Sequence, residues 1–254
     1  MNRLTIVVPC YNEGRRLDAG GFTEITAASP DISLLFVNDG SSDDTEERLR
    51  EIERMRPSQI GVLSLSKNVG KGEAVRRGML SAFDDGPDAV GYYDADLSTP
   101  PSELLRMWDV LRERDIAVLL AARVGLLGTT IERHAFRHFS GRIFATFASM
   151  TLNLRVYDTQ CGAKLFMASP ALRAALEDPF VSRWAFDVEL LGRLLTGTEH
   201  IAPLREEELQ EIPLQAWVDV PGSKLHIGSM VKTTSELLLI AGDLARRARR
   251  RKRA

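Results

Sequence analysis

The order of apolar runs in the first 125 residues is the feature that most restricts the fold. Short runs that are apolar throughout alternate with longer polar stretches of helical character. The predicted strands are 4–8, 32–37, 62–65, 89–93 and 117–122, and the predicted helices between them are 43–56, 71–83 and 101–114. This alternation predicts an α/β fold in which a mostly parallel sheet is flanked by helices on both faces. Ligands of such sheets bind beyond the carboxyl ends of the strands.

The pattern changes after about residue 129. A set of apolar residues has the spacing of one helix face, namely Phe136, Phe139, Ile143, Phe144, Phe147, Met150 and Leu154. We then predict a helix over 186–195, a strand over 211–218 and an amphipathic helix over 230–250. No internal repeat is present, and 254 residues suffice for one large α/β domain. We assign it to residues 1–228, followed by a C-terminal amphipathic helix with a polybasic tail over 229–254.

Polar clusters follow the first four predicted strands. They are the sequences PCYNE at 9–13, NDGSSDDT at 38–45, NVGKG at 68–72 and DAD at 94–96. Any one of them alone could be an ordinary turn, because Asp, Gly and Ser are common in turns for backbone reasons. Four clusters at four strand ends favour one shared binding crevice.

The residue types in these clusters suit a nucleotide. Tyr11 can stack on a base, and Glu13 and Asp39 can accept hydrogen bonds from a base N–H or from ribose hydroxyls. Lys71 lies between two glycines at a helix start, where backbone N–H groups and the ammonium group can face phosphate. The spacing is not that of a P-loop.

Asp94 and Asp96 alternate on an extended segment at a strand end. Paired carboxylates of this kind suit a hard divalent ion, Mg²⁺ or Mn²⁺, that also binds phosphate oxygens. Such an ion neutralises charge that builds up on a departing diphosphate. Together with the other clusters, the pair points to a nucleotide diphosphate-sugar donor.

These motifs resemble those of glycosyltransferase family 2, whose members have the Rossmann-like GT-A fold. The resemblance rests on P-x-Y-N-E, N-D-G-S-S-D-x-T and D-x-D. It extends to the segments NVGKG at 68–72, DTQCGAKLF at 158–166, RWAFDVE at 183–189 and PGSK at 221–224. Within the family the chain is most similar to the polyprenyl-phosphate branch of dolichyl-phosphate glucosyltransferases and mannosyltransferases. The RWAFDVE segment is closest to the glucosyl side.

The resemblance implies roles for individual residues. Nucleotide-binding roles fall to Pro9, Tyr11, Glu13, Asp39, Lys71 and Asp94; metal binding to Asp94 and Asp96; catalytic roles to Asp96, Asp158 and Arg123; and contacts with donor and acceptor phosphates to Arg137, Ser140 and Lys224. Asp158 is a candidate base or acceptor-orienting residue, or else a structural carboxylate that caps the turn at Cys161.

The implied reaction is an inverting hexosyl transfer by direct displacement at the anomeric carbon. A lipid monophosphate acceptor has a second pKa of about 6, so it needs no strong general base. We expect glucose from UDP-glucose as the donor and a polyprenyl or dolichyl phosphate as the acceptor. One alternative is a GDP-mannose-dependent polyprenyl-phosphate mannosyltransferase. Ser98 weakens this alternative, because some mannosyl members have Gln at this position. Another is a family 2 transferase with a soluble small-molecule or protein acceptor.

A processive polysaccharide synthase is disfavoured, because Phe180 stands at the glutamine position of the Q-x-x-R-W motif. Trp184 and Asp187 either shape a sugar pocket or serve as a core tryptophan and a solvated helix residue. Cys10 and Cys161 are too few for a disulfide framework, and we expect Cys161 to be a small buried hydrophobe.

Charge is distributed unevenly although the formal net charge is only −2. Residues 246–253 contain seven Lys or Arg and no acid. A basic tail on an acidic body indicates an anionic partner, for which a membrane surface is preferred. Nucleic acid is the weaker alternative, because the body has no recognition module. We find neither a signal peptide nor a spanning segment, and therefore expect a cytoplasmic protein that is peripheral on the cytoplasmic membrane face.

Overall fold

The computed structural model describes residues 3–132, 135–220 and 227–253, with side-chain positions omitted for 132, 135–140 and 227–235. The strands are β1 (Leu4–Cys10), β2 (Ile32–Asn38), β3 (Ile60–Ser64), β4 (Ala89–Tyr93), β5 (Val118–Ala122), β6 (Thr130–Glu132), β7 (Ala163–Met167), β8 (Leu209–Pro213) and β9 (Ala216–Val218). The helices are α1 (Ala19–Ala28), α2 (Thr45–Met55), α3 (Lys71–Ala82), α4 (Pro101–Glu113), α5 (Ala135–Leu152), α6 (Pro170–Glu177), α7 (Phe186–Thr196) and α8 (Ile227–Arg251), with short 3₁₀ turns at Phe83–Asp85 and Glu206–Glu208.

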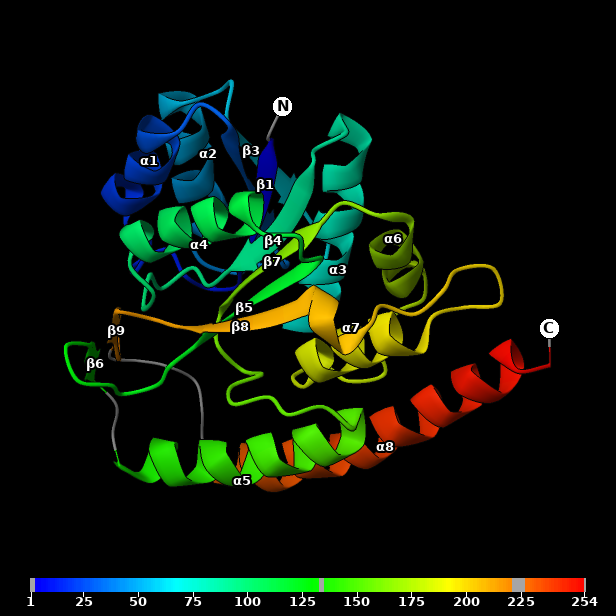
Figure 1. Cartoon of the computed structure of the whole chain (residues 1–254). Helices are drawn as coiled ribbons and strands as arrows, with labels where there is room; N and C mark the ends of the chain where they lie inside the picture. Colours follow the sequence, from blue (N-terminus) through cyan, green and yellow to red (C-terminus); the bar gives the residue numbers. More distant parts are fainter. Residues whose placement is uncertain (1–2, 133–134, 221–226, 254) are drawn as a thin grey trace.

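Seven strands form the central sheet in the order β3-β2-β1-β4-β7-β5-β8. All neighbours run parallel except β7, which is antiparallel to both β4 and β5. Strands β6 and β9 form a separate parallel pair. Helices cover both faces of the sheet (Figure 1). The predicted α/β class with a mostly parallel sheet is therefore confirmed.

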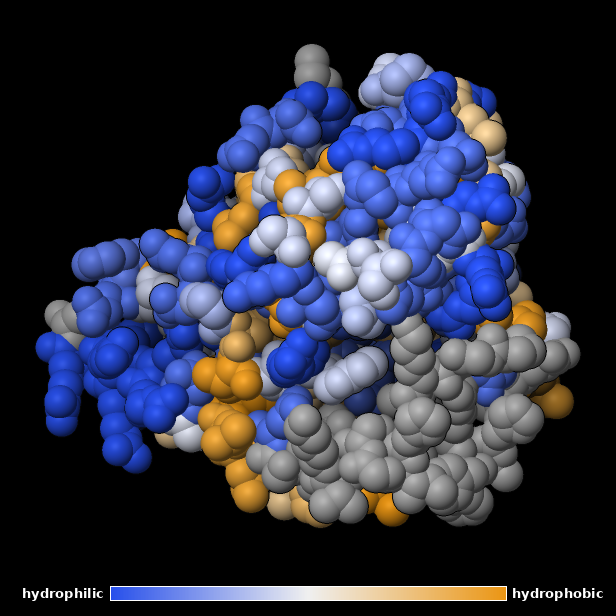
Figure 2. Space-filling model, turned by 180° about the vertical axis from the view of Figure 1, so that it is seen from behind, coloured by the Kyte–Doolittle hydropathy of each residue, from blue (hydrophilic) through white to orange (hydrophobic). Residues whose placement is uncertain are grey.

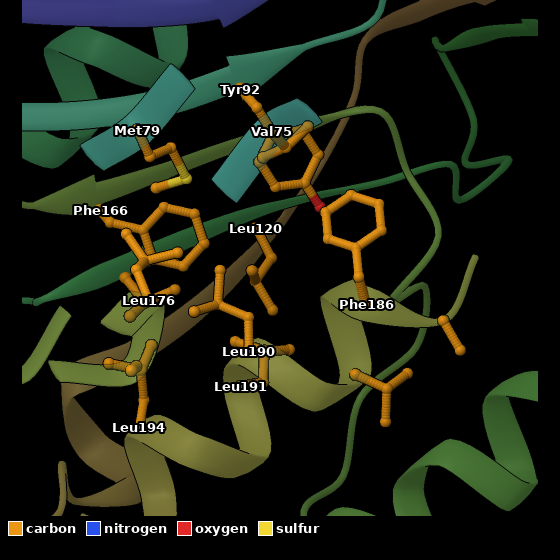
Figure 3. Close-up of a cluster of buried hydrophobic side chains, with 14 of the residues drawn as sticks. Val75, Met79, Tyr92, Leu120, Phe166, Leu176, Phe186, Leu190, Leu191 and Leu194 are labelled. Atoms are coloured by element: carbon orange, nitrogen blue, oxygen red, sulfur yellow. The ribbon is translucent and has the colours of Figure 1, made fainter. Parts of the chain in front are cut away.

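The apolar strands are explained by burial on both faces. Ile6 and Val8 of β1 belong to a core cluster shared with α1, α2 and α4, whereas Val7 belongs to a second cluster on the opposite face. Side chains alternate between the two faces of a strand, so both sets must be apolar. The second cluster packs α3, α6 and α7 against the sheet, and in Figure 3 the ring of Tyr92 lies against Phe186.

Several elements differ from the prediction. Helices α1 and α6 and strand β7 were not predicted; in α1 the pair Gly20-Gly21 lowers helix propensity, although Asp18 caps the helix through the Gly20 N–H. The predicted strand 211–218 is wrong as one element. It divides into β8 and β9, which belong to different sheets. Pro213, which has no N–H to donate, ends β8.

Helices α5 and α8 lie side by side as an outer layer (Figure 1). Leu237, Ile240 and Leu244 of α8 join the core. The predicted boundary at residue 228 falls inside α8, and the division into two parts remains a prediction. In α5 the predicted apolar stripe is not one face, because Phe144 is buried while Ile143 and others are exposed. Within the described residues no helix has the length and apolarity to span a bilayer.

Candidate functional site

A cavity of about 230 Å³ opens at the carboxyl edge of the sheet. It lies where β1, β4 and β5 end and where the antiparallel β7 begins. Six predicted site residues line it, namely Pro9, Glu13, Lys71, Asp94, Asp96 and Arg123. Residues of three of the four strand-end clusters line this cavity, whereas no residue of the cluster at 38–45 does.

The acidic pair follows β4 in a tight turn. Asp96 Oδ1 accepts a hydrogen bond from the Ser98 N–H at 3.0 Å, and Leu97 between them has a left-handed φ of 53°. The Ser98 carbonyl in turn accepts from the Val218 N–H of β9 at 2.9 Å. Both carboxylates thus reach the cavity from a loop that is fixed at its far end.

Lys71 lies opposite Asp94, with 2.5 Å between Nζ and Oδ1. Burial alone would lower the pKa of Lys71, but the charges of Asp94, Asp96 and Asp187 and the hydrogen bond to Asp94 raise it above its ordinary value. The lysine is therefore a permanent cation beside the acidic pair. It is positioned as the first residue of α3.

Gly162 allows β7 to approach the acidic pair. Its carbonyl accepts from the Asp94 N–H at 2.9 Å, and a Cβ at this position would lie 2.2 Å from Asp94 Oδ2. Only a residue without a side chain fits this space. The glycine of the DTQCG segment is thus explained by its contact with the D-x-D motif.

Arg123 and Asp158 form a two-pronged ion pair. The guanidinium donates from Nε to Oδ2 at 2.7 Å and from Nη2 to Oδ1 at 2.9 Å. Burial would lower the pKa of Arg123, but the Asp158 charge raises it. Asp158 also accepts from the Gln160 N–H at 3.2 Å. Asp158 is buried and does not line the cavity, whereas Arg123 does.

Glu211 of β8 supports this pair from behind. Its carboxylate accepts from the backbone N–H groups of Tyr157 at 2.8 Å and of Asp158 at 2.7 Å. Burial, with a further contribution from the nearby Asp158 charge, raises the pKa of Glu211. The ring of Trp217 stacks on the Arg123 guanidinium, whose carbon is 5.3 Å from the ring centre.

Asp39 and Tyr11 do not line the cavity. Asp39 is buried and accepts hydrogen bonds from the Val69 N–H at 2.7 Å, the Gly70 N–H at 2.9 Å and Asn68 Nδ2 at 3.0 Å. It thereby holds the loop that leads into Lys71. Tyr11 is partly exposed outside the cavity. Their predicted nucleotide-binding roles remain predictions.

Glu13 joins the first two clusters. Its carboxylate pairs with Arg16 at 2.5 Å, and its N–H donates to Thr45 Oγ1 at 2.8 Å. The neighbouring Asn12 N–H donates to Ser41 Oγ at 3.0 Å. The loops after β1 and β2 therefore form one hydrogen-bonded unit.

Three predicted phosphate-binding residues are not placed. Arg137 and Ser140 belong to α5, but their side chains lie outside the described part of the structure, as does the whole of Lys224. Their roles stay predictions.

Sequence reasoning missed or left open several cavity residues. Trp184, in the loop before α7, and Asp187, in the first turn of α7, line the cavity, which favours the pocket-shaping interpretation. Trp217 and Asp219 line it from β9 and beyond, and no motif had indicated them. Burial raises the pKa of Asp187. The positive charge of the buried Lys164, whose Nζ lies 3.8 Å from Asp187 Oδ2, acts in the opposite direction and lowers it.

Lys164 lies inside the DTQCGAKLF motif, but no role had been assigned to it. Its Nζ donates to the Cys161 carbonyl at 2.6 Å and lies 5.2 Å from the Tyr92 ring centre. The prediction for Cys161 is confirmed, since it is buried, and burial raises the pKa of its thiol to about 11.

Fold and cavity together define a GT-A type of transferase, in which a parallel sheet presents acidic and basic side chains at its carboxyl edge. Residues 5–173 match the profile of Glycosyl transferase family 2. The chain belongs to glycosyltransferase family 2 and is a hexosyltransferase.

Two curated relatives are dolichyl-phosphate beta-glucosyltransferases. The protein of Trichomonas vaginalis is 32% identical over 93% of this chain and 70% of its own length. That of Drosophila melanogaster is 32% identical over 87% of this chain and 69% of its own length. The match extends over most of the chain in both cases.

Solved structures with a similar fold include glucosyl-3-phosphoglycerate synthase from Mycobacterium tuberculosis. Its complex with UDP has a TM-score of 0.66 at 17% identity, covering 96% of this chain and 80% of that one. Its complex with Mn²⁺, UDP-glucose and phosphoglyceric acid has a TM-score of 0.65 at 19% identity, covering 95% and 80%. At such identities the likeness establishes the fold.

Proposed function

We propose that this protein transfers glucose from UDP-glucose to a polyprenyl phosphate such as dolichyl phosphate, with inversion at the anomeric carbon. The observation that carries the proposal is the meeting of Asp94, Asp96, Lys71 and Arg123 in one cavity. Acids next to fixed cations suit a sugar diphosphate whose charge grows as the bond to the sugar breaks. The names of the curated relatives support the choice of glucose and of the lipid acceptor.

Asp94 and Asp96 would hold a divalent ion, Mg²⁺ or Mn²⁺, which supplies charge neutralisation to the departing diphosphate. Their carboxylate oxygens are the hard donors that these ions prefer. Among the described residues no three acidic, His or Cys side chains form a complete metal site. The remaining ligands in this proposal are phosphate oxygens of the donor.

The chain's own cations have separate tasks in this proposal. Lys71, fixed at the start of α3 and paired with Asp94, faces the donor diphosphate. Arg123 is oriented by Asp158 and faces the phosphate of the acceptor. A phosphate monoester is already mostly ionised at neutral pH, so Asp158 acts by orienting Arg123 rather than by removing a proton.

The acceptor implies a membrane. We propose a peripheral enzyme at the cytoplasmic membrane face, in which residues 1–228 form the catalytic part and the basic C-terminal helix over 229–254 contacts lipid. The seven Lys and Arg of residues 246–253 support this assignment.

A thermal-shift panel of UDP-glucose and GDP-mannose, each with and without Mn²⁺, tests the donor. A donor at about 100 times its Kd stabilises the fold by about 2.7 kcal/mol. We expect this stabilisation for UDP-glucose only when Mn²⁺ or Mg²⁺ is added. A transfer assay then compares dolichyl phosphate in detergent micelles with soluble phosphate monoesters. Unchanged melting temperatures throughout would contradict the proposal.

A further inference from the structure

The outer layer formed by α5 and α8 exposes apolar side chains to solvent. On α5, Ile143, Phe147 and Met150 are 56%, 44% and 72% exposed, and on α8, Leu238 and Leu239 are 77% and 60% exposed. We name these five side chains the apolar patch. Their neighbours Phe144 on α5 and Leu237 on α8 are buried in the core, so both helices are apolar on two sides rather than one. A surface helix of a globular domain is ordinarily polar on its outer side.

A basic segment continues α8 beyond the apolar patch. Residues 249–253 are four arginines and one lysine, all exposed, and no acidic residue follows Asp243. We name these five residues the basic end. Figure 2 shows hydrophobic side chains along the lower part of the molecule and a group of hydrophilic side chains beyond them, where α8 projects.

Both helices are connected to residues of the cavity. Helix α5 follows β6, which pairs with β9, the strand that carries the cavity residue Trp217. Helix α8 also holds a wall of the cavity. The buried Glu236 accepts hydrogen bonds from the Ser182 hydroxyl and from the Trp184 N–H, the latter at 3.4 Å. The layer that exposes the apolar patch is therefore bonded to the loop that places Trp184 at the site.

We propose that the apolar patch and the basic end together dock the protein on an anionic lipid bilayer. Apolar side chains on one side of a helix enter the boundary between headgroups and acyl chains, and neighbouring Arg and Lys attract anionic headgroups. A basic end next to an apolar patch fits a negatively charged surface with an apolar layer beneath it, which is the structure of an anionic bilayer. The purpose of this docking rests on the proposed function, since a lipid acceptor lies in a membrane. Binding to the bilayer does not itself require the acceptor.

Vesicle sedimentation tests this proposal. The probes are vesicles of phosphatidylcholine alone and vesicles of phosphatidylcholine with phosphatidylglycerol, both without polyprenyl phosphate. We expect binding to the anionic vesicles and much weaker binding to the neutral ones. Phe147→Ser combined with Leu238→Ser should reduce binding to the anionic vesicles at least about tenfold, through loss of the buried apolar area. Arg249→Gln, Arg250→Gln and Arg251→Gln together should reduce it by a similar factor.

Matched controls come from α2, on the other face of the sheet. Met55 is 58% exposed there, and Arg48 and Arg54 are exposed as well. Met55→Ser and the pair Arg48→Gln and Arg54→Gln should leave vesicle binding unchanged. Equal effects of the patch variants and these controls would overturn the proposal, as would a folded protein that ignores anionic vesicles.

Measurements of donor binding and of oligomeric state distinguish failure of the docking proposal from failure of the proposed function. The patch variants should keep the metal-dependent thermal shift with UDP-glucose, because the substituted side chains do not line the cavity. Vesicle binding without any donor-dependent shift would defeat the proposed function and leave the docking surface intact. Light scattering that shows a dimer dissociated by the patch variants, without vesicle binding, would make the patch an interface between copies and overturn the docking proposal.

Discussion

Two aspartates separated by one residue have different surroundings in this site. Asp94 is held by the Gly162 carbonyl and by Lys71, whereas Asp96 is held by the backbone of its own turn. Asp96 has no cation among these hydrogen-bond partners, although the charge of Lys71 also acts on it. It is the carboxylate that depends most on the proposed divalent ion for charge compensation.

Asp96→Ala should reduce transfer at least about 100-fold, because even outer partners of metal ligands are worth about 10–100-fold. The fold should be retained, since the residue lies in a surface-accessible turn at the cavity. A radiolabelled transfer assay and a melting curve measure the two effects. Asp109→Ala, on the exposed side of α4, is the control. A variant at position 96 that kept most of its activity would contradict the metal site.

Asp158→Ala should destabilise the protein by about 3–5 kcal/mol, because the partly buried Arg123 loses its carboxylate partner. Urea unfolding measures this change. Arg123→Gln combined with Asp158→Asn should cost less than the sum of the two single changes, since the pair acts as a unit. Strictly additive losses would show that the two residues act separately.

At this scale the sequence predicts best where a site residue follows directly from its own strand. Asp94, Asp96 and Arg123 stand just beyond the ends of β4 and β5 and line the cavity. The strand pattern pointed to the two aspartates and the family resemblance to Arg123, and their roles remain predictions. Trp217, Asp219 and Lys164 could not be identified in this way. Their importance comes from contacts with segments far away in the chain, such as the stacking of Trp217 on Arg123.

Strand β7 determines the shape of the site at the scale of elements. It was not predicted, because five residues interrupted by Lys164 directly after a cluster of turn residues give little periodic signal. Its antiparallel direction places its first residues beside the last residues of β4. Gly162 lies at this junction.

Gly162→Ala should destabilise the protein by about 1–3 kcal/mol and lower transfer, because the new methyl group would overlap the Asp94 carboxylate. Gly242→Ala in α8 is the matched control. Nothing lies within 4 Å of its added Cβ, and the change should stabilise the helix by about 0.5–1 kcal/mol. Thermal unfolding should show a lower melting temperature for Gly162→Ala and a higher one for Gly242→Ala. Destabilisation of equal size in both would contradict the close-approach argument.

Helix α8 is also attached through charge. Asp243 pairs with Arg247 at 2.7 Å and Arg246 at 3.1 Å, and Arg247 reaches Asp178 at 2.9 Å. Burial would raise the pKa of Asp243, but these arginines lower it below its ordinary value. We therefore expect protonation of Asp243 to weaken the attachment of α8, since Asp243 holds the same Arg247 that reaches Asp178.

A carboxylate with a depressed pKa stabilises the folded state above its unfolded value of about 3.9, and this contribution is lost as pH falls through the folded pKa. Hydrogen exchange of α8 amides should therefore speed up below about pH 4, relative to the central strands. Asp243→Asn should show faster exchange already at neutral pH and less further change in acid. The same pH response in parent and variant would rule out this coupling.

At the scale of the whole molecule, the sequence predicted the layered architecture but not the order of its strands. Burial on both faces can be read from uniformly apolar runs such as 4–8. The order β3-β2-β1-β4-β7-β5-β8 depends on which strands pair, and one strand in it was unpredicted. For the same reason the division of 211–218 between two sheets could not be predicted from the residues alone.

The basic end at residues 249–253 gives a prediction about membrane binding at the scale of the whole molecule. A chain lacking residues 249–253 should fold normally, because those side chains are exposed. It should bind anionic vesicles more weakly than the full chain at low salt. At about 1 M salt the Debye length falls to about 3 Å, so the two proteins should bind equally through their apolar side chains. Sedimentation across a salt series measures this, and a gap that persists at high salt would contradict it.

The reversed direction of β7 has one further consequence. The chain leaves the sheet at the end of β5 and re-enters it at the start of β7, so residues 123–162 depart from and return to the same rim. Such a segment can change in length without shifting the register of the seven-stranded sheet, although β6 within it pairs with β9. This segment includes Arg123 and Asp158, for which we propose acceptor-side roles, so we expect acceptor preference to change with its sequence while the central sheet is retained.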